Sequence, residues 1–222
     1  MDTALFTSVG LDHLFRWVHF LAGITWIGLL YYFNFVQTEY FKEAEDAHKS
    51  GAIQKLVPRA LWWFRWGAML TFLTGLLMLA MKGIGISLDI AVGATLGTLM
   101  FLNVWMIIWP KQRVVIASAT QVAQGGEADP AAPGALAKAG LASRTNTLFS
   151  IPLLFFMGSS AHLPSGPVTA AGPLELGLLF LLIFALEGNA IFGRQAIMTS
   201  VRGVISCGIG LTMVLYGIIV MV

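Results

Sequence analysis

Residues 16–37 read RWVHFLAGITWIGLLYYFNFVQ, and this apolar stretch decides the fold class. At about 1.5 Å per residue, a helix of this length crosses the roughly 30 Å hydrocarbon core of a bilayer. The small residues Ala22, Gly23 and Gly28 would let a neighbouring helix approach closely. One imidazole, His19, lies within the apolar run. Because an ionisable group inside a span is costly and usually faces a partner, a ligand or water, His19 is the first candidate functional residue.

The composition of the whole chain is also typical of a membrane protein. Of its 222 residues, 57% are hydrophobic and 11% are charged, whereas a soluble domain carries about 25% charged residues. The net charge of +2 arises mostly from loops between apolar segments, so it does not indicate a nucleic-acid partner. The sequence has a single cysteine, Cys207, and no Cys-x-x-Cys-His motif. An internal disulfide and covalently attached haem of the usual c type are therefore excluded.

The apolar segments predict an all-α fold, a polytopic membrane helical bundle with about six transmembrane helices that forms one domain over residues 1–222. The predicted spans are residues 11–37, 58–81, 87–109, 146–163, 174–192 and 204–222. Gly-rich and Pro-rich stretches separate them, and Pro110 is expected to end the third span. A short surface helix is expected within residues 39–59, and a cytoplasmic extension of the fourth span is expected from Ala135 onward.

Lys and Arg gather in alternate loops, and this asymmetry predicts the orientation. The loops after the first, third and fifth spans carry Lys42, Lys49, Lys55, Arg59, Lys111, Arg113, Lys138, Arg144, Arg194 and Arg202. The opposite side has only Arg16 and Lys82, near helix ends. We therefore expect cytoplasmic loops at about 38–57 and 111–145 and both termini outside. The expected location is the bacterial inner (cytoplasmic) membrane, with the lipid bilayer in contact with the helices.

Two histidines on different predicted helices fall in the outer half of the membrane. By the helical rise, His19 lies about 12 Å below the outer end of the first span, and His162 stands at the outer end of the fourth. A b-type haem needs an imidazole nitrogen on each face of its iron. We therefore expect haem b with His19 and His162 as iron ligands and His13 as a reserve ligand. The alternative is that these histidines make hydrogen bonds in the bundle interior or at the membrane interface.

A second polar layer is predicted nearer the cytoplasm. Arg65 lies about 10 Å from the inner end of the second span by the helical rise, and Glu187, Asn103 and Asn34 fall at similar depths in other spans. An Arg and a Glu at matched depth should pair, since either charge alone would be costly. Arg65 and Glu187 then form either a structural ion pair or a catalytic substrate pocket. In the pocket, Arg65 would act as donor and Glu187 as acceptor or base, and Asn103 and Asn34 would also bind substrate.

Four stretches together resemble one known family. They are HFLAGITWIGLLYYFNFVQ (19–37), LVPRALWWFRWGAMLTFLTGLL (56–77), MFLNVWMIIWPKQ (100–112) and SRTNTLFSIPLLFFMGSSAH (143–162). As a set they are similar to the membrane domain of the bacterial cytochrome-c-linked urate hydroxylases. The resemblance implies oxidation of urate to 5-hydroxyisourate and electron transfer to a fused C-terminal cytochrome c domain. Because this sequence ends at Val222 without such a domain, we expect a separate periplasmic cytochrome c as the acceptor.

Three functions remain open at this point. The first is a urate hydroxylase-type oxidoreductase that acts on a purine-like substrate. The second is a haem-b electron-transfer subunit of a respiratory membrane complex, with no substrate of its own. The third is a haemless accessory subunit. A haem spectrum would separate the third function from the other two, and urate turnover with cytochrome c would separate the first from the second.

Overall fold

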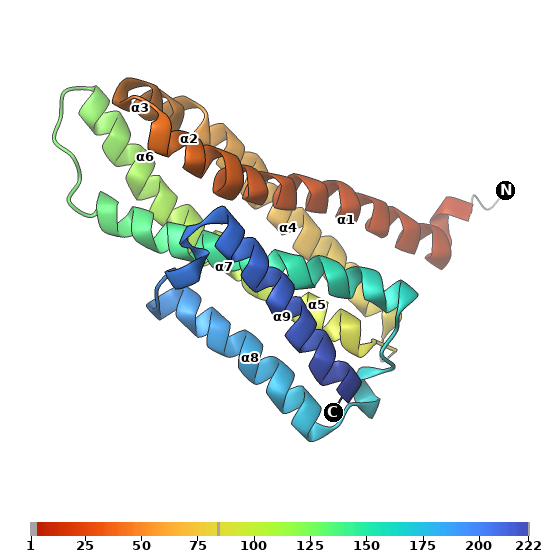
Figure 1. Cartoon of the computed structure of the whole chain (residues 1–222). Helices are drawn as coiled ribbons and strands as arrows, with labels where there is room; N and C mark the ends of the chain where they lie inside the picture. The colour runs from red at the N-terminus through yellow and green to blue at the C-terminus, as the bar shows by residue number, and fades with distance from the viewer. Residues whose placement is uncertain (1–3, 84, 222) are drawn as a thin grey trace.

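The computed structural model describes residues 4–83 and 85–221, and these residues form a bundle of long helices (Figure 1). The elements in chain order are η1 (Ala4–Phe6), α1 (Ser8–Tyr31), η2 (Tyr32–Gln37), α2 (Thr38–Glu43), α3 (Asp46–Lys55), α4 (Val57–Lys82), α5 (Leu88–Leu102), η3 (Asn103–Ile108), α6 (Trp109–Ala123), α7 (Ala132–His162), η4 (Val168–Ala170), α8 (Pro173–Phe192), η5 (Ala196–Thr199) and α9 (Val201–Met221). The described residues contain no β-strand. The predicted all-α bundle is therefore confirmed.

Five continuous helices are long and apolar enough to cross a membrane. They are Ser8–Glu43, Val57–Lys82, Leu88–Ala123, Pro173–Phe192 and Val201–Met221. Each covers nearly all of one predicted span, so the chain is a multi-pass membrane protein. The remaining predicted span, the fourth (residues 146–163), falls mostly on α7, which is not among these five helices.

The helix α7 lies in the middle of the bundle, and this position explains its composition. It packs against α1, α5, α6, α8 and α9. Its buried side chains include the polar residues Arg144, Thr145, Asn146, Thr147, Ser150 and Ser159. A helix surrounded by other helices contacts protein rather than lipid, so it can carry polar groups that a lipid-facing helix would not.

The third predicted span continues past Pro110 into α6, so the expected end at this proline is wrong. The segment η3 that precedes it is π-helical. In such a wide turn the backbone N–H groups bond five residues back, as Trp109 N–H does with the Val104 carbonyl. The proline ring therefore avoids the clash it would make in a regular α-helix, and the chain stays helical up to Ala123.

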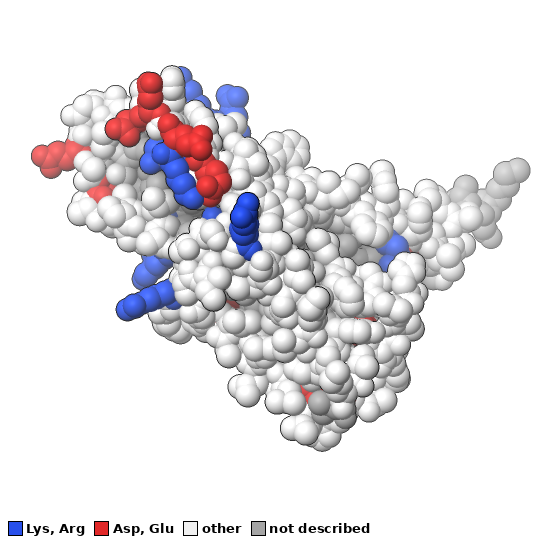
Figure 2. Space-filling view, viewed as in Figure 1, with Lys and Arg blue, Asp and Glu red and all other residues white. Residues whose placement is uncertain are grey.

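Charged side chains gather at one end of the bundle, around α2 and α3 (Figure 2). The surface helix expected within residues 39–59 is confirmed as α3, which packs against α4 and α6. The expected extension of the fourth span is also present, because α7 begins at Ala132. The start of α1 and the end of α9 lie away from this charged end (Figure 1). The cytoplasmic loops and the side on which the termini lie stay predictions.

Small residues allow a close approach between the backbones of α1 and α4. A Cβ atom added at Gly67 would lie 3.2 Å from the Ala22 carbonyl oxygen and 3.2 Å from the Trp26 backbone nitrogen. Ala22 therefore lies where α1 and α4 approach each other closely, as the small side chain of this residue predicted. A Cβ atom added at Gly28 would have no neighbouring atom within 4 Å, so Gly28 does not mark a close approach between helices.

Candidate functional site

A buried cluster of amide and carboxyl groups joins α7, α8 and the start of η3. Asn103 Nδ2 donates to Glu187 Oε2 at 3.1 Å and to Asn146 Oδ1 at 3.0 Å. Asn146 Nδ2 donates in turn to the Met100 carbonyl at 2.9 Å. All three polar side chains are buried, Glu187 with 8% of its surface exposed. We call Asn103, Asn146 and Glu187 the interior cluster.

The local backbone explains why Asn103 and Asn146 take these positions. The π-helical turn of η3 begins at Asn103, whose backbone N–H is shared between the Leu99 and Met100 carbonyls. The Asn146 amide supplies a second donor to the Met100 carbonyl. The cluster is thus built into the helix geometry, and π-helical turns frequently occur at functional sites.

Arg65 does not reach this cluster, so the expected Arg65–Glu187 ion pair is wrong. The only ion pairs among the described residues are Arg16–Asp12 and Lys42–Glu39. The Arg65 guanidinium instead lies 3.8 Å from the Trp109 ring centroid and 6.0 Å from that of Trp105. The indole faces attract the cation, and η3 and α6, which carry them, pack against α4.

Asn34 lies in the other π-helical segment, η2, and is joined to α7 rather than to Glu187. Its Nδ2 donates to Ser143 Oγ at 2.8 Å and to the Leu30 carbonyl at 2.9 Å. Four residues were predicted for the inner polar layer, and among them a hydrogen bond joins Asn103 to Glu187. Arg65 and Asn34 are held by other partners.

His19 is anchored to α4 by one ring nitrogen. Its Nδ1 lies 3.0 Å from Thr74 Oγ1, and that hydroxyl donates its single proton to a backbone carbonyl, with Leu70 O at 2.7 Å. With its proton directed to the backbone, Thr74 accepts from His19 in the tautomer that carries the proton on Nδ1, and in this tautomer Nε2 keeps its lone pair. Donation from the other ring nitrogen is the usual arrangement of a metal-bound histidine.

The other two candidate haem ligands are exposed. His162 lies in the last turn of α7, and His13 lies on the first turns of α1. Within residues 4–83 and 85–221, no hydrogen bond joins His19 to His162, and no group of three or more His, Cys, Asp or Glu side chains could hold a metal ion. The haem-ligand set therefore stays a prediction, with His19 the best prepared of the three.

Two buried charged residues were not recognised in the sequence. Asp89 in α5 is fully buried, and its oxygens accept from Ser159 Oγ at 2.6 Å and from the Ser165 backbone at 2.8 Å. Arg144 was counted among the loop charges, but it is 3% exposed within α7. A signal for Arg144 was present, because it begins the run RTNT, whose polar side chains cover more than one helix face.

An open groove of about 400 Å³ lies between α7, α8 and α9. Most of its lining is apolar. Thr145 and Asn189 contribute polar groups from α7 and α8, and Arg194 and Gln195 contribute them from the segment that follows α8. Asn103, Asn146 and Glu187 are not among its lining residues. Its size suits a small organic molecule.

Comparison with protein families gives one match. Residues 87–220, more than half of the chain, match the family model described as urate oxidase N-terminal. The chain belongs to the urate oxidase N-terminal family. The comparisons with curated proteins and with solved structures found no match.

The family match bears directly on the site. All three residues of the interior cluster and the whole lining of the groove fall inside the matched range of the urate oxidase N-terminal family. His19, Asn34 and Arg65 lie outside it. The matched range thus contains the interior cluster, whereas the other candidate residues of the inner polar layer, Asn34 and Arg65, lie before it.

Proposed function

We propose that this protein is a membrane oxidoreductase of the urate hydroxylase type, which oxidises a purine-like substrate and passes the electrons to a separate periplasmic cytochrome c. The observation that carries the proposal is the interior cluster within the family-matched region. Conversion of urate to 5-hydroxyisourate adds the oxygen of one water molecule and releases two protons and two electrons. Two ferricytochromes c, each accepting one electron, balance the reaction.

Glu187 is the residue best suited to accept a proton in this reaction. It is a buried carboxyl held by the amide of Asn103, not by a cation. It can therefore gain or lose a proton without breaking an ion pair. The groove of about 400 Å³ between α7, α8 and α9 has room for a purine-sized molecule, with Asn189 and Thr145 as polar groups on its wall.

A haem b held by His19 would supply the one-electron chemistry that connects a two-electron substrate to cytochrome c. The Nδ1–Thr74 hydrogen bond fixes the ring and leaves Nε2 with a lone pair. The His19 ring also packs against α4, where a Cβ added at Gly75 would lie 3.3 Å from His19 Cε1. His162 is proposed as the second ligand and His13 as its substitute.

A haem-b electron-transfer or accessory subunit of a respiratory complex is the second candidate. The hydrogen bond that orients His19 favours this second function, because His19 could bind a haem iron whether or not a substrate binds at Glu187. This function predicts haem redox activity without turnover of urate.

The deciding experiment has two measurements on purified protein prepared with haem available. The dithionite-reduced minus oxidised spectrum tests for an α-band, and cytochrome c reduction in the presence of urate tests turnover. Both signals support the oxidoreductase. An α-band without turnover supports the electron-transfer subunit, and the absence of both rejects the two functions.

A further inference from the structure

Arg144 is a buried cation without a hydrogen bond among the described residues. Only 3% of its surface is exposed, and its Nη1 lies in the interior with no partner. Leaving a buried guanidinium unpaired costs several kcal/mol in general. A native interior therefore normally supplies an acceptor for such a group.

Three further unpaired polar atoms come from the elements around Arg144. They are Gln37 Oε1 in η2, Arg65 Nε in α4 and Trp105 Nε1 in η3. The helix α7 packs against both η2 and η3, and α4 packs against η3. Ser143, the residue before Arg144, accepts from Asn34 of η2 at 2.8 Å. The Arg65 guanidinium lies 6.0 Å from the Trp105 ring centroid.

One more unpaired atom, Trp26 Nε1, lies apart from this group. It precedes Gln37 by eleven residues on the same continuous helix, which is about 16 Å along the axis. The four atoms of Gln37, Arg65, Trp105 and Arg144 are therefore considered together, and we call these residues the inner junction.

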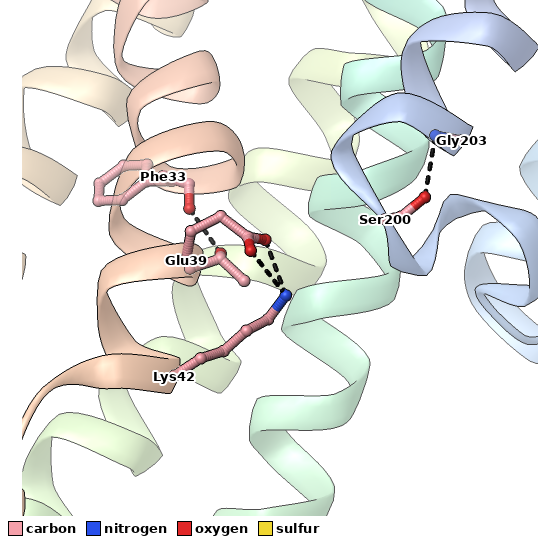
Figure 3. A network of polar contacts seen from close by, with 6 residues as sticks. Phe33, Glu39, Lys42, Ser200 and Gly203 are labelled. Carbon is pink, nitrogen blue, oxygen red and sulfur yellow. Dashed lines mark hydrogen bonds and ion pairs between the residues drawn. The ribbon is translucent and has the colours of Figure 1, made fainter.

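The charges around the inner junction do not neutralise it. Glu39 is the carboxylate that acts on Arg144, but both of its oxygens accept from Lys42, at 2.8 and 2.9 Å (Figure 3). Arg113 adds a further cation, 6.0 Å from the Trp109 ring on which Arg65 stacks. The junction thus has an excess of positive charge, with one buried arginine, Arg144, and one half-buried arginine, Arg65, and such a charge attracts an anion.

We propose that the inner junction is a binding site for a small anion, anchored by the Arg144 guanidinium. The unpaired atoms define the chemistry of the ligand. Three are donors, on Arg144, Arg65 and Trp105, and one is an acceptor, on Gln37. The complementary ligand carries negative charge on acceptor atoms and at least one N–H or O–H group.

Two sources have this chemistry, a purine-like anion such as urate and a protonated inorganic phosphate. Identifying the anion as urate rests on the proposed function, whereas the anion site itself does not. A purine anion bound here would occupy a site distinct from the interior cluster. It would reach the junction from the charged end of the bundle, where α2 and α3 lie (Figure 2).

Equilibrium binding tests the proposal without relying on turnover. Radiolabelled urate and radiolabelled phosphate are each measured against the purified full chain in neutral detergent. We expect saturable binding of at least one probe. Arg144→Gln should weaken it at least tenfold, because the guanidinium supplies the buried charge. Arg59→Gln, an exposed arginine on α4, serves as the matched control and should bind normally.

A second measurement covers the case in which Arg144→Gln does not fold. The bound probe should raise the melting temperature of the unmodified protein, and this shift should be reduced in Gln37→Ala, which loses the acceptor and keeps both guanidinium groups. Saturable urate binding without urate turnover would uphold the anion site and reject the proposed function. Failure of both probes to bind, or equal binding by Arg144→Gln and the unmodified protein, overturns the anion site.

Discussion

Asn103 and Glu187 are joined by a hydrogen bond of 3.1 Å between α8 and the first residue of a π-helical turn. The carboxyl therefore has an amide as its partner, while the cation expected to pair with it stacks on Trp109. Among the described residues, Glu187 lies in no ion pair. A buried carboxyl with a neutral partner is suited to proton exchange more than to fixing the fold through charge.

Replacement of Glu187 by Gln should reduce urate-dependent cytochrome c reduction by about 100-fold or more, the usual contribution of a general base. Glutamine keeps the size and can still accept from Asn103, so the fold should persist. The haem spectrum should be unchanged, because His19 is held by α1 and α4. Glu127→Gln, on an exposed loop, is the control. A wild-type rate in Glu187→Gln would leave this residue with a structural role only.

Replacement of His19 by Ala should abolish or greatly weaken haem retention. The reduced minus oxidised spectrum would lose its α-band, while the exposed His48→Ala variant keeps it. Thr74→Val removes the acceptor that fixes Nδ1–H and should weaken haem retention less than the loss of the ligand does. An unchanged α-band in His19→Ala would eliminate this residue as an axial ligand.

The orientation predicted from Lys and Arg can be tested by cysteine labelling. In a Cys207→Ser background, a cysteine at Ala131 should react with an impermeant reagent only from the cytoplasmic side. A cysteine at Pro167 should react only from outside. Both positions are exposed, so access does not limit the reaction. The opposite pattern would invert the molecule and place His162 on the cytoplasmic side.

The sequence predicts the helices well because hydrophobicity and helix length are local properties. The predicted spans 58–81 and 174–192 match α4 and α8 to within a residue. The third span was predicted to end at Pro110, and this was wrong. The effect of this proline on the helix depends on the π-helical turn before it, which no local sequence pattern reveals. The polar face of α7 depends on which helices surround it, and this information is not in the segment itself.

Depth along a helix proved insufficient to pair residues of the candidate site. Arg65 and Glu187 were placed at matching depth, but a pair also needs helix faces that point at each other. Packing decides those faces: Arg65 points at Trp109, and Glu187 at Asn103. Asn103 was correctly assigned to the same layer as Glu187, whereas its partner Asn146 was recognisable only from the fold.

Asp89 should contribute substantially to stability. Asp89→Ala leaves the Ser165 backbone N–H without its acceptor and removes the Ser159 contact, in a place with no exposure. We expect a loss of roughly 2–4 kcal/mol in the free energy of unfolding. Denaturant unfolding in detergent measures it. Asp89→Asn keeps one acceptor oxygen and should lose less. Equal stability of Asp89→Ala and the unmodified protein would contradict the role of this carboxylate.

The close contact between α1 and α4 should depend on Gly67. A side chain there meets backbone atoms of α1, at 3.2 Å from both the Ala22 carbonyl oxygen and the Trp26 nitrogen, and backbone cannot turn aside as a flexible side chain can. Gly67→Leu should therefore separate the helices and destabilise the protein by about 1–3 kcal/mol. The His19–Thr74 bond crosses the same interface, so haem retention should fall with it.

Gly28→Leu is the matched control for this last prediction, because it has the same gain in helix propensity and no atom within 4 Å of the added Cβ. Its melting temperature and haem spectrum should equal those of the unmodified protein. If Gly67→Leu behaved like Gly28→Leu in both measurements, the α1–α4 contact would not be what holds His19 in place. If both variants lost stability alike, the added side chain would be acting through its contact with lipid and not through helix packing.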